Sequence, residues 1–487
     1  MESTKPTTQP SLRRALGPWA AIAVVIGTTI GSGIFLVPTD MVKAVGSPAM
    51  VFAVWVFGGI LTLFGALTYA ELSAALPDAG GEYVYLNAAY GRFFGFIYGW
   101  TQTWVAKCAS IATLGTAFFT YLANFFPGLN GVFYTVPLPI GPHWAPLEIR
   151  FGQLLAIGVI LFLASVNYVG VRVGGGVQVA VTALKLSLIG GLIVAGVTSS
   201  HGNIRNFQLS MPADPGGVSG FFVALVAALW AYDGWNNAGM LGSEIERPEK
   251  NLPRALIIGT ISVMAVYLLA NVAYFYVLSG PEVGGEESAR TGVAAVMMRH
   301  VMGQTGAAMV SVAAMISIFA ALNGSILSGS RVPYAMARDG YFFQPFSHVH
   351  PRFRTPGAAI VLLGIWSSLV LLSGQYKQLY TLVIFPSWIL YGMTAASVIV
   401  LRRKRPDLNR PYTVMGYPVV PVLFVFVALA LLYSTLRASP RESGIGLAVI
   451  AAGLPFYFHW KARVNKREIP PGSSVSPGQA SVPKKGT

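Results

Sequence analysis

The sequence has little charge and almost no cysteine. Only 10% of its 487 residues are charged, against roughly 25% in a typical soluble domain. The single cysteine, Cys108, excludes an internal disulfide and a metal site built from cysteines. Because 54% of the residues are hydrophobic, these shortages exclude an ordinary soluble domain and indicate a membrane protein.

Long apolar sequence is what the chain has in abundance. Runs of about 20 apolar residues, each enough to cross a bilayer core, recur from end to end, and the mean hydropathy is +0.60. The sequence therefore predicts an all-α polytopic membrane protein with twelve transmembrane helices. The expected spans lie near 16–39, 48–75, 92–124, 147–168, 176–198, 217–242, 254–279, 304–330, 356–374, 378–401, 417–436 and 443–460.

Basic residues outnumber acidic ones, 33 to 18, which could indicate either nucleic-acid binding or membrane topology. Twelve spans put both chain ends on one side of the membrane. On that side fall 23 of the lysines and arginines, while 8 fall on the other side and two lie within spans. This bias places both termini in the cytoplasm and removes the nucleic-acid interpretation. We expect a multi-pass protein of a bacterial inner membrane.

The first span has weak helix formers in its middle. Between Ile26 and Phe35 it carries three glycines, a serine and two threonines. Two interpretations follow. Gly27 and Gly31 have the spacing of small residues that lets helices pack closely. Alternatively, the helix is broken there, and its freed amides and carbonyls bind a substrate.

The sixth span is interrupted in the same way, because glycine, aspartate and asparagine follow an apolar helix that ends near Trp230. We expect Ala231 to Gly234 to be unwound, with Asp233 capping the helix half that follows. Two breaks placed five spans apart are typical of a transporter whose substrate site lies between two inverted halves. The pair of breaks therefore favours the binding interpretation of the first span.

These features divide the chain into four parts. Residues 1–15 are polar, and no short apolar core followed by a small-residue cleavage site is present, so the first span is interpreted as retained. The expected parts are a cytoplasmic N-terminal segment over 1–15, a transporter core over 16–401 (repeat one about 16–198, repeat two about 217–401), helices 11 and 12 with the preceding basic cytoplasmic loop over 402–460, and a disordered cytoplasmic tail over 461–487.

Two lysines inside apolar spans need an explanation, because a bare ammonium is costly in a bilayer. Lys107, in span three, should have a partner or reach a polar cavity, and the sequence leaves a structural and a functional role equally open. Lys185, in span five, is too deep to extend to the membrane surface, so we expect it to face the protein interior and contact carbonyls or hydroxyls. Since desolvation disfavours its charged form, Lys185 is also a candidate proton carrier.

A broken helix offers amides to an anion and carbonyls to a cation, so two broken helices suit a zwitterion. We expect the amides of Ser32 and Gly33 to hold a carboxylate. An ammonium would be held by carbonyls near three residues: Thr29, Trp230 and Asp233. Trp230 is large enough to cover the pocket and is a candidate gate. The other predicted substrate-binding residues are Ile30, Gly31 and Ala231.

Several spaced motifs resemble one family. They are Ile30-Gly-Ser-Gly-Ile-Phe35, Tyr69-Ala-Glu-Leu72 with Ala79-Gly-Gly-x-Tyr83, the segment from Trp230 to Trp235, Asn251-Leu-Pro253, and Ser330-Arg-Val-x-Tyr-Ala-Met-Ala-Arg-Asp-Gly340. Over roughly residues 15 to 460 the chain resembles the amino acid-polyamine-organocation superfamily, and especially its L-type amino acid transporter branch.

The resemblance implies a fold of five plus five inverted helices followed by two more, with helices 1 and 6 unwound in mid-membrane, and amino acid transport by alternating access. It implies that the amides from Gly31 to Gly33 contact the substrate carboxylate, and that carbonyls of spans one and six contact its amine. Lys185 matches the family lysine that stands where sodium sits in sodium-coupled relatives, which implies sodium-independent transport. Animal L-type transporters bind a glycoprotein through an outer-loop cysteine. This chain has no loop cysteine, so no disulfide-linked partner subunit is expected.

We therefore expect transport of neutral L-amino acids, by exchange or by proton symport, with Lys185 coupling spans one, five and eight. The alternative is a cationic amino acid or polyamine transporter in which Asp233 meets the positive charge. A channel is disfavoured by the closed mid-membrane site, and a nutrient sensor that binds without transporting stays open. The sequence has no HExxH, GxSxG or P-loop pattern, so we expect no enzymatic activity, and no cofactor or metal.

Overall fold

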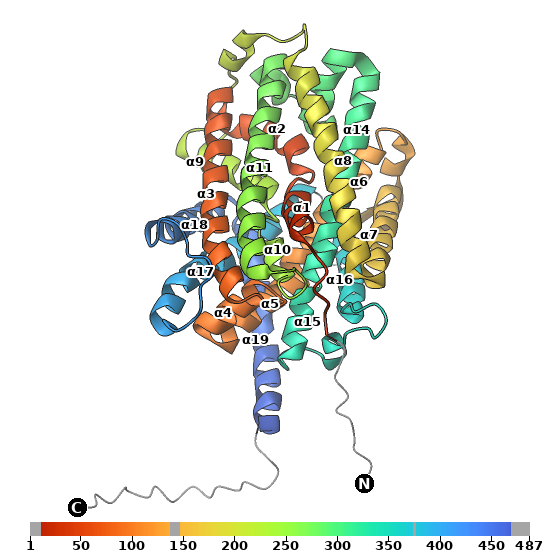
Figure 1. The fold of residues 1–487 in the computed structure, drawn as a ribbon. Coiled ribbons are helices and arrows are strands. Elements are labelled where there is room, and N and C mark those ends of the chain that lie inside the picture. The colour runs from red at the N-terminus through yellow and green to blue at the C-terminus, as the bar shows by residue number, and fades with distance from the viewer. Residues whose placement is uncertain (1–10, 137–146, 374–375, 469–487) are drawn as a thin grey trace, which may run out of the picture.

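The apolar runs fold into helices that stand side by side, and the computed structural model describes residues 11–136, 147–373 and 376–468 (Figure 1). The elements of the first half are α1 (Pro18–Thr29), α2 (Gly33–Val45), α3 (Pro48–Ala75), α4 (Glu82–Tyr90), α5 (Arg92–Thr101), the π-helical turn η1 (Gln102–Ala106), α6 (Lys107–Leu122), the 3₁₀ turn η2 (Pro127–Asn130), β1 (Val132–Val136), β2 (Leu147–Arg150), α7 (Phe151–Val169), α8 (Val171–Val197) and the 3₁₀ turn η3 (Ile204–Gln208).

The second half begins with the other interrupted span. Its elements are α9 (Gly217–Tyr232), α10 (Asn237–Met240), α11 (Pro248–Val277), α12 (Gly280–Val283), α13 (Glu286–Thr291), α14 (Val293–Gly329), α15 (Arg331–Arg338), the 3₁₀ turn η4 (Gln344–Ser347), α16 (Gly357–Leu372), α17 (Tyr376–Lys404), α18 (Val419–Ala438) and α19 (Pro440–Glu468). The segment before α1 and the C-terminal end of α19 lie at the same end of the bundle (Figure 1).

The predicted architecture is confirmed at the level of an all-α polytopic membrane protein. Among the described residues, nine helices are long and apolar enough to cross a membrane, and α1 with α2 makes a tenth, bent by 41°. Two shorter apolar helices, α9 and α16, stand at predicted spans six and nine. The count of twelve spans therefore remains a prediction. Helix α3 begins and ends at the predicted residues 48 and 75, whereas α14 begins at Val293, well before the predicted residue 304.

The segment between α6 and α7 contains two paired β-strands that the sequence patterns do not predict. Strands β1 and β2 pair antiparallel, with Tyr134 opposite Ile149 and Thr135 opposite Glu148. The residues of β1 are valine, phenylalanine, tyrosine and threonine, which favour strands, but a five-residue run beside prolines and glycines is too short to stand out. The all-α description therefore holds for the membrane-spanning helices, and the two strands are an addition between α6 and α7.

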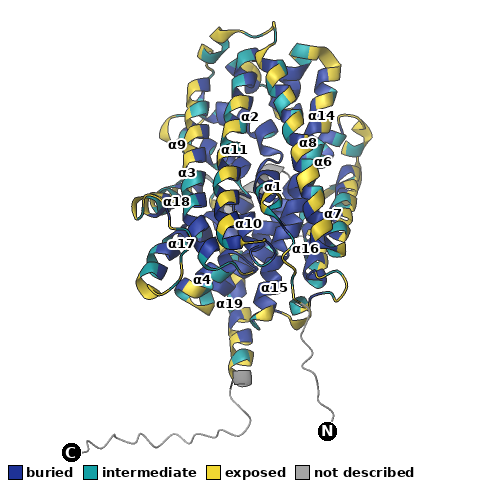
Figure 2. Cartoon of the chain, in the orientation of Figure 1, coloured by how far each residue is buried: buried dark blue, intermediate teal, exposed yellow. Residues whose placement is uncertain are grey.

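The bundle is apolar on its outside as well as in its core. Figure 2 shows exposed residues along the outward faces of α3, α11, α8 and α7, with buried residues between them. Large apolar side chains such as Leu269, Ile365 and Phe426 are exposed there. Exposed apolar surface on so many outer helices is what a lipid-facing protein presents. This chain is a multi-pass integral membrane protein.

One buried ion pair fastens the end of the bundle where the chain begins. Both oxygens of the Glu244 carboxylate accept from the Arg331 guanidinium, at 2.7 and 2.9 Å, and both side chains are fully buried. The backbone carbonyl of Glu244 also accepts from the amides of Ala15 and Leu16, at 2.9 and 3.0 Å. The chain before α1 is thus tied to the segment after α10 and, through it, to α15. Burial of a charge pair is costly unless the geometry is bidentate, as it is here.

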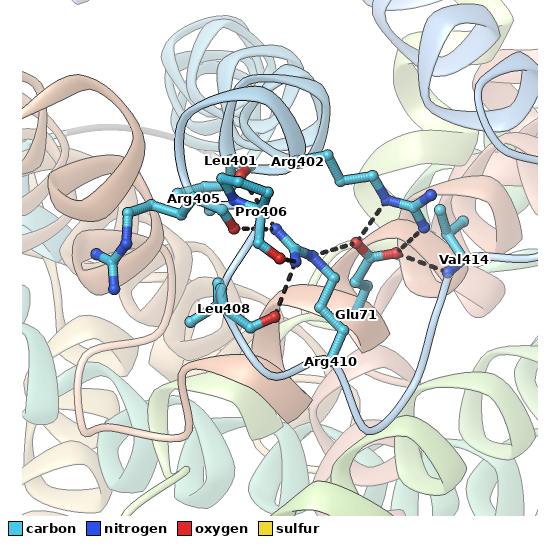
Figure 3. A network of polar contacts seen from close by, with 8 residues as sticks. All are labelled: Glu71, Leu401, Arg402, Arg405, Pro406, Leu408, Arg410 and Val414. Atoms are coloured by element: carbon cyan, nitrogen blue, oxygen red, sulfur yellow. Dashed lines mark hydrogen bonds and ion pairs between the residues drawn. The ribbon is translucent and has the colours of Figure 1, made fainter.

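A second polar cluster joins the end of α3 to the loop after α17 (Figure 3). The Glu71 carboxylate accepts from Arg402 Nε at 2.9 Å, from a terminal Arg402 nitrogen at 2.6 Å and from the Val414 amide at 2.7 Å. Arg410 lies 3.5 Å from the same carboxylate and donates to backbone carbonyls at the end of α17 and in the loop. The Glu71 of the Tyr69-to-Leu72 motif therefore orders a basic loop against the bundle.

The predicted boundary of the C-terminal tail is wrong. Helix α19 continues to Glu468, eight residues past the predicted end of span twelve at 460. Residues 461–468 are mostly lysine, arginine, alanine and glutamate, which favour helix even where no core covers them. The rest of the predicted tail, from 469 onward, and most of the predicted N-terminal segment, residues 1–10, lie outside the described residues.

Candidate substrate site

The first span is broken where the glycines predict it. Helix α1 ends at Thr29 and α2 begins at Gly33, with Ile30 to Ser32 between them outside both helices and Ile30 extended. A Cβ on Gly33 would lie 2.6 Å from the Cα and Cβ of Ala231, so glycine is required for the approach of α9. Close packing at the break is therefore confirmed, and substrate binding by the break remains a prediction.

The second break lies two residues further on than predicted. Ala231 and Tyr232 still belong to α9, and the unwound segment runs over residues 233–236 before α10 begins. Gly234 sits in this segment with a φ of +101°, a conformation that residues with a Cβ rarely adopt. Ala231 and Tyr232 continue the helix. Asp233 and Gly234 end it, because aspartate and glycine are poor helix formers.

Asp233 does not cap the following helix, so that prediction is wrong. The N-cap position of α10 is held by Asn236, three residues later, and Asp233 is the residue at which α9 ends. The Asp233 carboxylate instead accepts a hydrogen bond from the hydroxyl of Tyr391 on α17, at 2.8 Å. The sequence could not show this partner, because the two residues are 158 positions apart.

The two breaks are joined directly. The Thr28 hydroxyl, at the end of α1, lies 2.8 Å from the Gly234 carbonyl and 2.7 Å from the Val24 carbonyl of its own helix, so it can donate across the two breaks. The Tyr267 hydroxyl, from α11, lies within bonding distance of two carbonyls, that of Thr29 at 3.0 Å and that of Ala231 at 2.6 Å. A hydroxyl has one proton to donate, so Tyr267 can serve only one of these carbonyls at a time.

Lys185 reaches the first break from α8, as predicted. It is fully buried, and its ammonium donates to the carbonyl of Gly27 at 2.8 Å and to that of Ile30 at 2.5 Å. Ser317, from α14, donates to the same Ile30 carbonyl at 3.0 Å. These carbonyls lie at the end of α1, where a helix leaves its last acceptors without helical partners. The predicted contact of Lys185 with carbonyls is confirmed, and its coupling role remains a prediction.

A small cavity lies between the two breaks. It is lined by residues of α1, α2, α6, α9, α10, α14 and the breaks: Thr28, Thr29, Gly31, Ser32, Gly33, Ser110, Leu114, Trp230, Asp233, Gly234, Asn237 and Ser325. Six of the predicted substrate-binding residues are in this lining, among them Trp230, the predicted gate.

Two predicted residues are not in the lining. The carbonyl of Ile30 is turned to Lys185 and Ser317, and the carbonyl of Ala231 is turned to Tyr267. Both residues therefore belong to the support of the breaks. Sequence reasoning missed Tyr267 and Ser317 altogether, since a tyrosine or a serine in an apolar span carries no signal of its contacts. The partner of Lys107 is now visible, because its ammonium donates to the Asn237 side-chain oxygen at 2.7 Å.

An integral membrane bundle with a cavity between two broken helices has the architecture of a secondary transporter. Over residues 16–458 the chain matches the profile of the amino acid permease family. The chain belongs to this family, within the amino acid-polyamine-organocation superfamily and its L-type-like branch, and it is an amino acid permease.

Curated relatives cover almost the whole chain. The serine/threonine exchanger SteT of Bacillus subtilis is 35% identical over 459 residues, which are 94% of this chain and 99% of that protein. The human b(0,+)-type amino acid transporter 1 is 32% identical over 95% of this chain and 91% of its own length. The mouse large neutral amino acids transporter small subunit 2 is 32% identical over 92% of this chain and 81% of its own length. These relatives are transporters.

We expect Tyr267→Phe to lower amino acid uptake about 2- to 13-fold, because the hydroxyl that spans the two breaks contributes about 0.5–1.5 kcal/mol as a neutral hydrogen bond. Initial rates of uptake into liposomes containing the purified variant would measure the loss. Tyr433→Phe is the matched control, since Tyr433 is 59% exposed on α18. Wild-type rates in Tyr267→Phe would show that the two carbonyls do not depend on this hydroxyl.

Proposed function

We propose that this permease exchanges neutral L-amino acids across the membrane, independently of sodium, by alternating access between two inverted halves of its bundle. The observation that carries the proposal is the cavity in which backbone from both breaks meets small polar side chains. The amides at the start of α2 would hold the substrate carboxylate, and the carbonyls that end α1 and α9 would hold its ammonium. Such a site recognises the amino acid backbone and leaves the side chain to the cavity walls.

The walls favour a small or uncharged substrate side chain. Ser110, Leu114 and Ser325 add hydroxyl and methyl groups to the lining, and Trp230 limits its size. A serine/threonine exchanger and a large neutral amino acid transporter among the relatives support the same substrate class. The bacterial relative SteT is a serine/threonine exchanger, which supports exchange as the transport mode of this chain.

Sodium independence follows from the position of Lys185. Its ammonium already holds the carbonyls of Gly27 and Ile30, at the place where the family resemblance puts sodium in sodium-coupled relatives. A second cation in contact with the same carbonyls would be repelled by the first. We further propose that both termini lie in the cytoplasm, with the inner membrane of a bacterium as the location.

Asp233 favours a second candidate, transport of cationic amino acids or polyamines. Its carboxylate is in the cavity lining and could meet a positive side chain. A b(0,+)-type transporter is among the relatives.

An uptake panel tests the proposal. Liposomes containing the full chain would be offered labelled serine, alanine and leucine, with and without amino acid inside, with and without sodium, and with and without a proton gradient. We expect uptake of neutral amino acids that needs internal amino acid and is unchanged by removing sodium. Uptake driven by the proton gradient alone would replace exchange by symport. Tight binding of lysine or putrescine without alanine or leucine binding would contradict the neutral substrate class.

A further inference from the structure

Lys107 is a buried lysine beside the cavity. The proposed binding of an amino acid backbone does not require this lysine. It begins α6, directly after the π-helical turn η1. Only 6% of it is exposed. Gly329 makes room for its stem, since a Cβ at that position would lie 2.5 Å from the lysine Cγ. The chain therefore packs closely around this side chain, which favours a fixed position for its ammonium.

The ammonium of Lys107 points to the second break. It donates to the side-chain oxygen of Asn237, which lines the cavity and is the first residue of α10. Two buried carboxyl groups, those of Asp233 and Glu82, lie close enough to interact with its charge. Asp233 is the acidic residue in the cavity lining, so the pair of Lys107 and Asp233 decides the charge that a substrate meets there.

Glu82 stands behind this pair, outside the cavity lining. Its carboxylate accepts from the Tyr98 hydroxyl at 2.9 Å and from the side-chain amide of Asn236. The other titratable groups around Lys107, Asp233 and Glu82 are Cys108 and four tyrosines: Tyr69, Tyr85, Tyr98 and Tyr391. Lys107 is therefore the cation that balances Asp233.

A carboxylate in a low-dielectric cavity attracts cationic substrates strongly unless a neighbouring cation offsets its charge. Asp233 by itself would make the cavity selective for lysine, ornithine or a polyamine. With Lys107 beside it, an additional cation gains little from entering, because Lys107 repels it as Asp233 attracts it. Selectivity of this kind depends on a repulsive group as much as on an attractive one.

We propose that Lys107 is a specificity-determining residue whose ammonium offsets the carboxylate of Asp233 and thereby keeps the amino acid site selective for uncharged substrates. This inference rests on the proposed neutral amino acid transport and assigns the residue that makes the difference between the two substrate classes considered above.

The test compares lysine with serine uptake in liposomes containing the full chain. Lys107→Met removes the charge and keeps a side chain of similar length, and it should raise the ratio of lysine to serine uptake at least about tenfold. Lys107→Arg keeps the charge and should stay near the wild-type ratio. The double variant Lys107→Met with Asp233→Asn removes both charges and should also return toward that ratio. A merely structural lysine would lower uptake of both substrates together.

A reciprocal variant, Asp233→Asn, tests the role of Lys107 even if Lys107→Met does not yield folded protein. Asp233→Asn leaves the ammonium of Lys107 without its cavity-lining partner, and it should raise the ratio of glutamate to serine uptake at least about tenfold. An unchanged ratio in either single variant would overturn the role of Lys107. A wild-type protein that takes up lysine better than serine would also overturn it, whereas a wild-type protein that takes up no amino acid would contradict the proposed function instead.

Discussion

Lys185→Met should reduce amino acid uptake roughly 13- to 160-fold. The substitution leaves the carbonyls of Gly27 and Ile30 without the ammonium that holds both of them at the first break. A hydrogen bond to a charged group contributes about 1.5–3 kcal/mol, and each 1.36 kcal/mol corresponds to a tenfold change. Methionine keeps the length and apolar stem of the side chain, so the packing between α8 and α1 is changed little. Initial uptake rates in liposomes would measure the effect.

The matched control for this variant is Lys250→Met, because Lys250 is exposed near the start of α11. It should transport at the wild-type rate. If Lys185 also carries the coupled proton, Lys185→Met should remove any dependence of the remaining uptake on pH. Wild-type uptake with unchanged pH dependence in Lys185→Met would refute the coupling role.

Gly33→Ala should reduce uptake roughly 5- to 160-fold. The added Cβ would lie 2.6 Å from the Cα and Cβ of Ala231, where no flexible side chain can give way. Relieving the overlap must move α2 away from α9, and overpacking of this kind costs about 1–3 kcal/mol. The amides at the start of α2 would then be displaced from the carbonyls of α9, so the substrate would lose one of its two contact groups.

Gly190→Ala is the control for this glycine. Gly190 also lies in a helix, α8, but a Cβ there meets no atom within 4 Å. We expect wild-type uptake and stability from it. Size-exclusion profiles of both variants would separate loss of transport from loss of fold. Full uptake by folded Gly33→Ala would mean that the contact between the two breaks is not needed for binding.

The helices and both breaks could be predicted because their causes are local. Apolar runs of the right length predict the spans, and the glycines around Ser32 and at Gly234 interrupt helices wherever these fold. Lys185 could be predicted as well, since a lysine far from either end of an apolar span has to find acceptors inside the protein. These arguments need no knowledge of which helices are neighbours.

The contacts that complete the site could not be predicted, because they join residues far apart in the chain. Tyr391 and Asp233 are 158 positions apart, and Tyr267 and Thr29 are 238 apart. The prediction that Asp233 caps α10 was wrong for the same reason. A local rule assigns Asp233 to the nearest helix start, whereas the folded chain offers it a hydroxyl from α17. The strands β1 and β2 were missed for the opposite reason, since they are local but very short.

The single proton of the Tyr267 hydroxyl has a consequence for the empty carrier. One donor divides its time between the carbonyls of Thr29 and Ala231, and of these two residues Thr29 lines the cavity. A substrate ammonium bound to the Thr29 carbonyl would leave the Tyr267 proton to the Ala231 carbonyl. Binding as proposed would therefore select one hydrogen-bonding arrangement of Tyr267 where the empty carrier alternates between two.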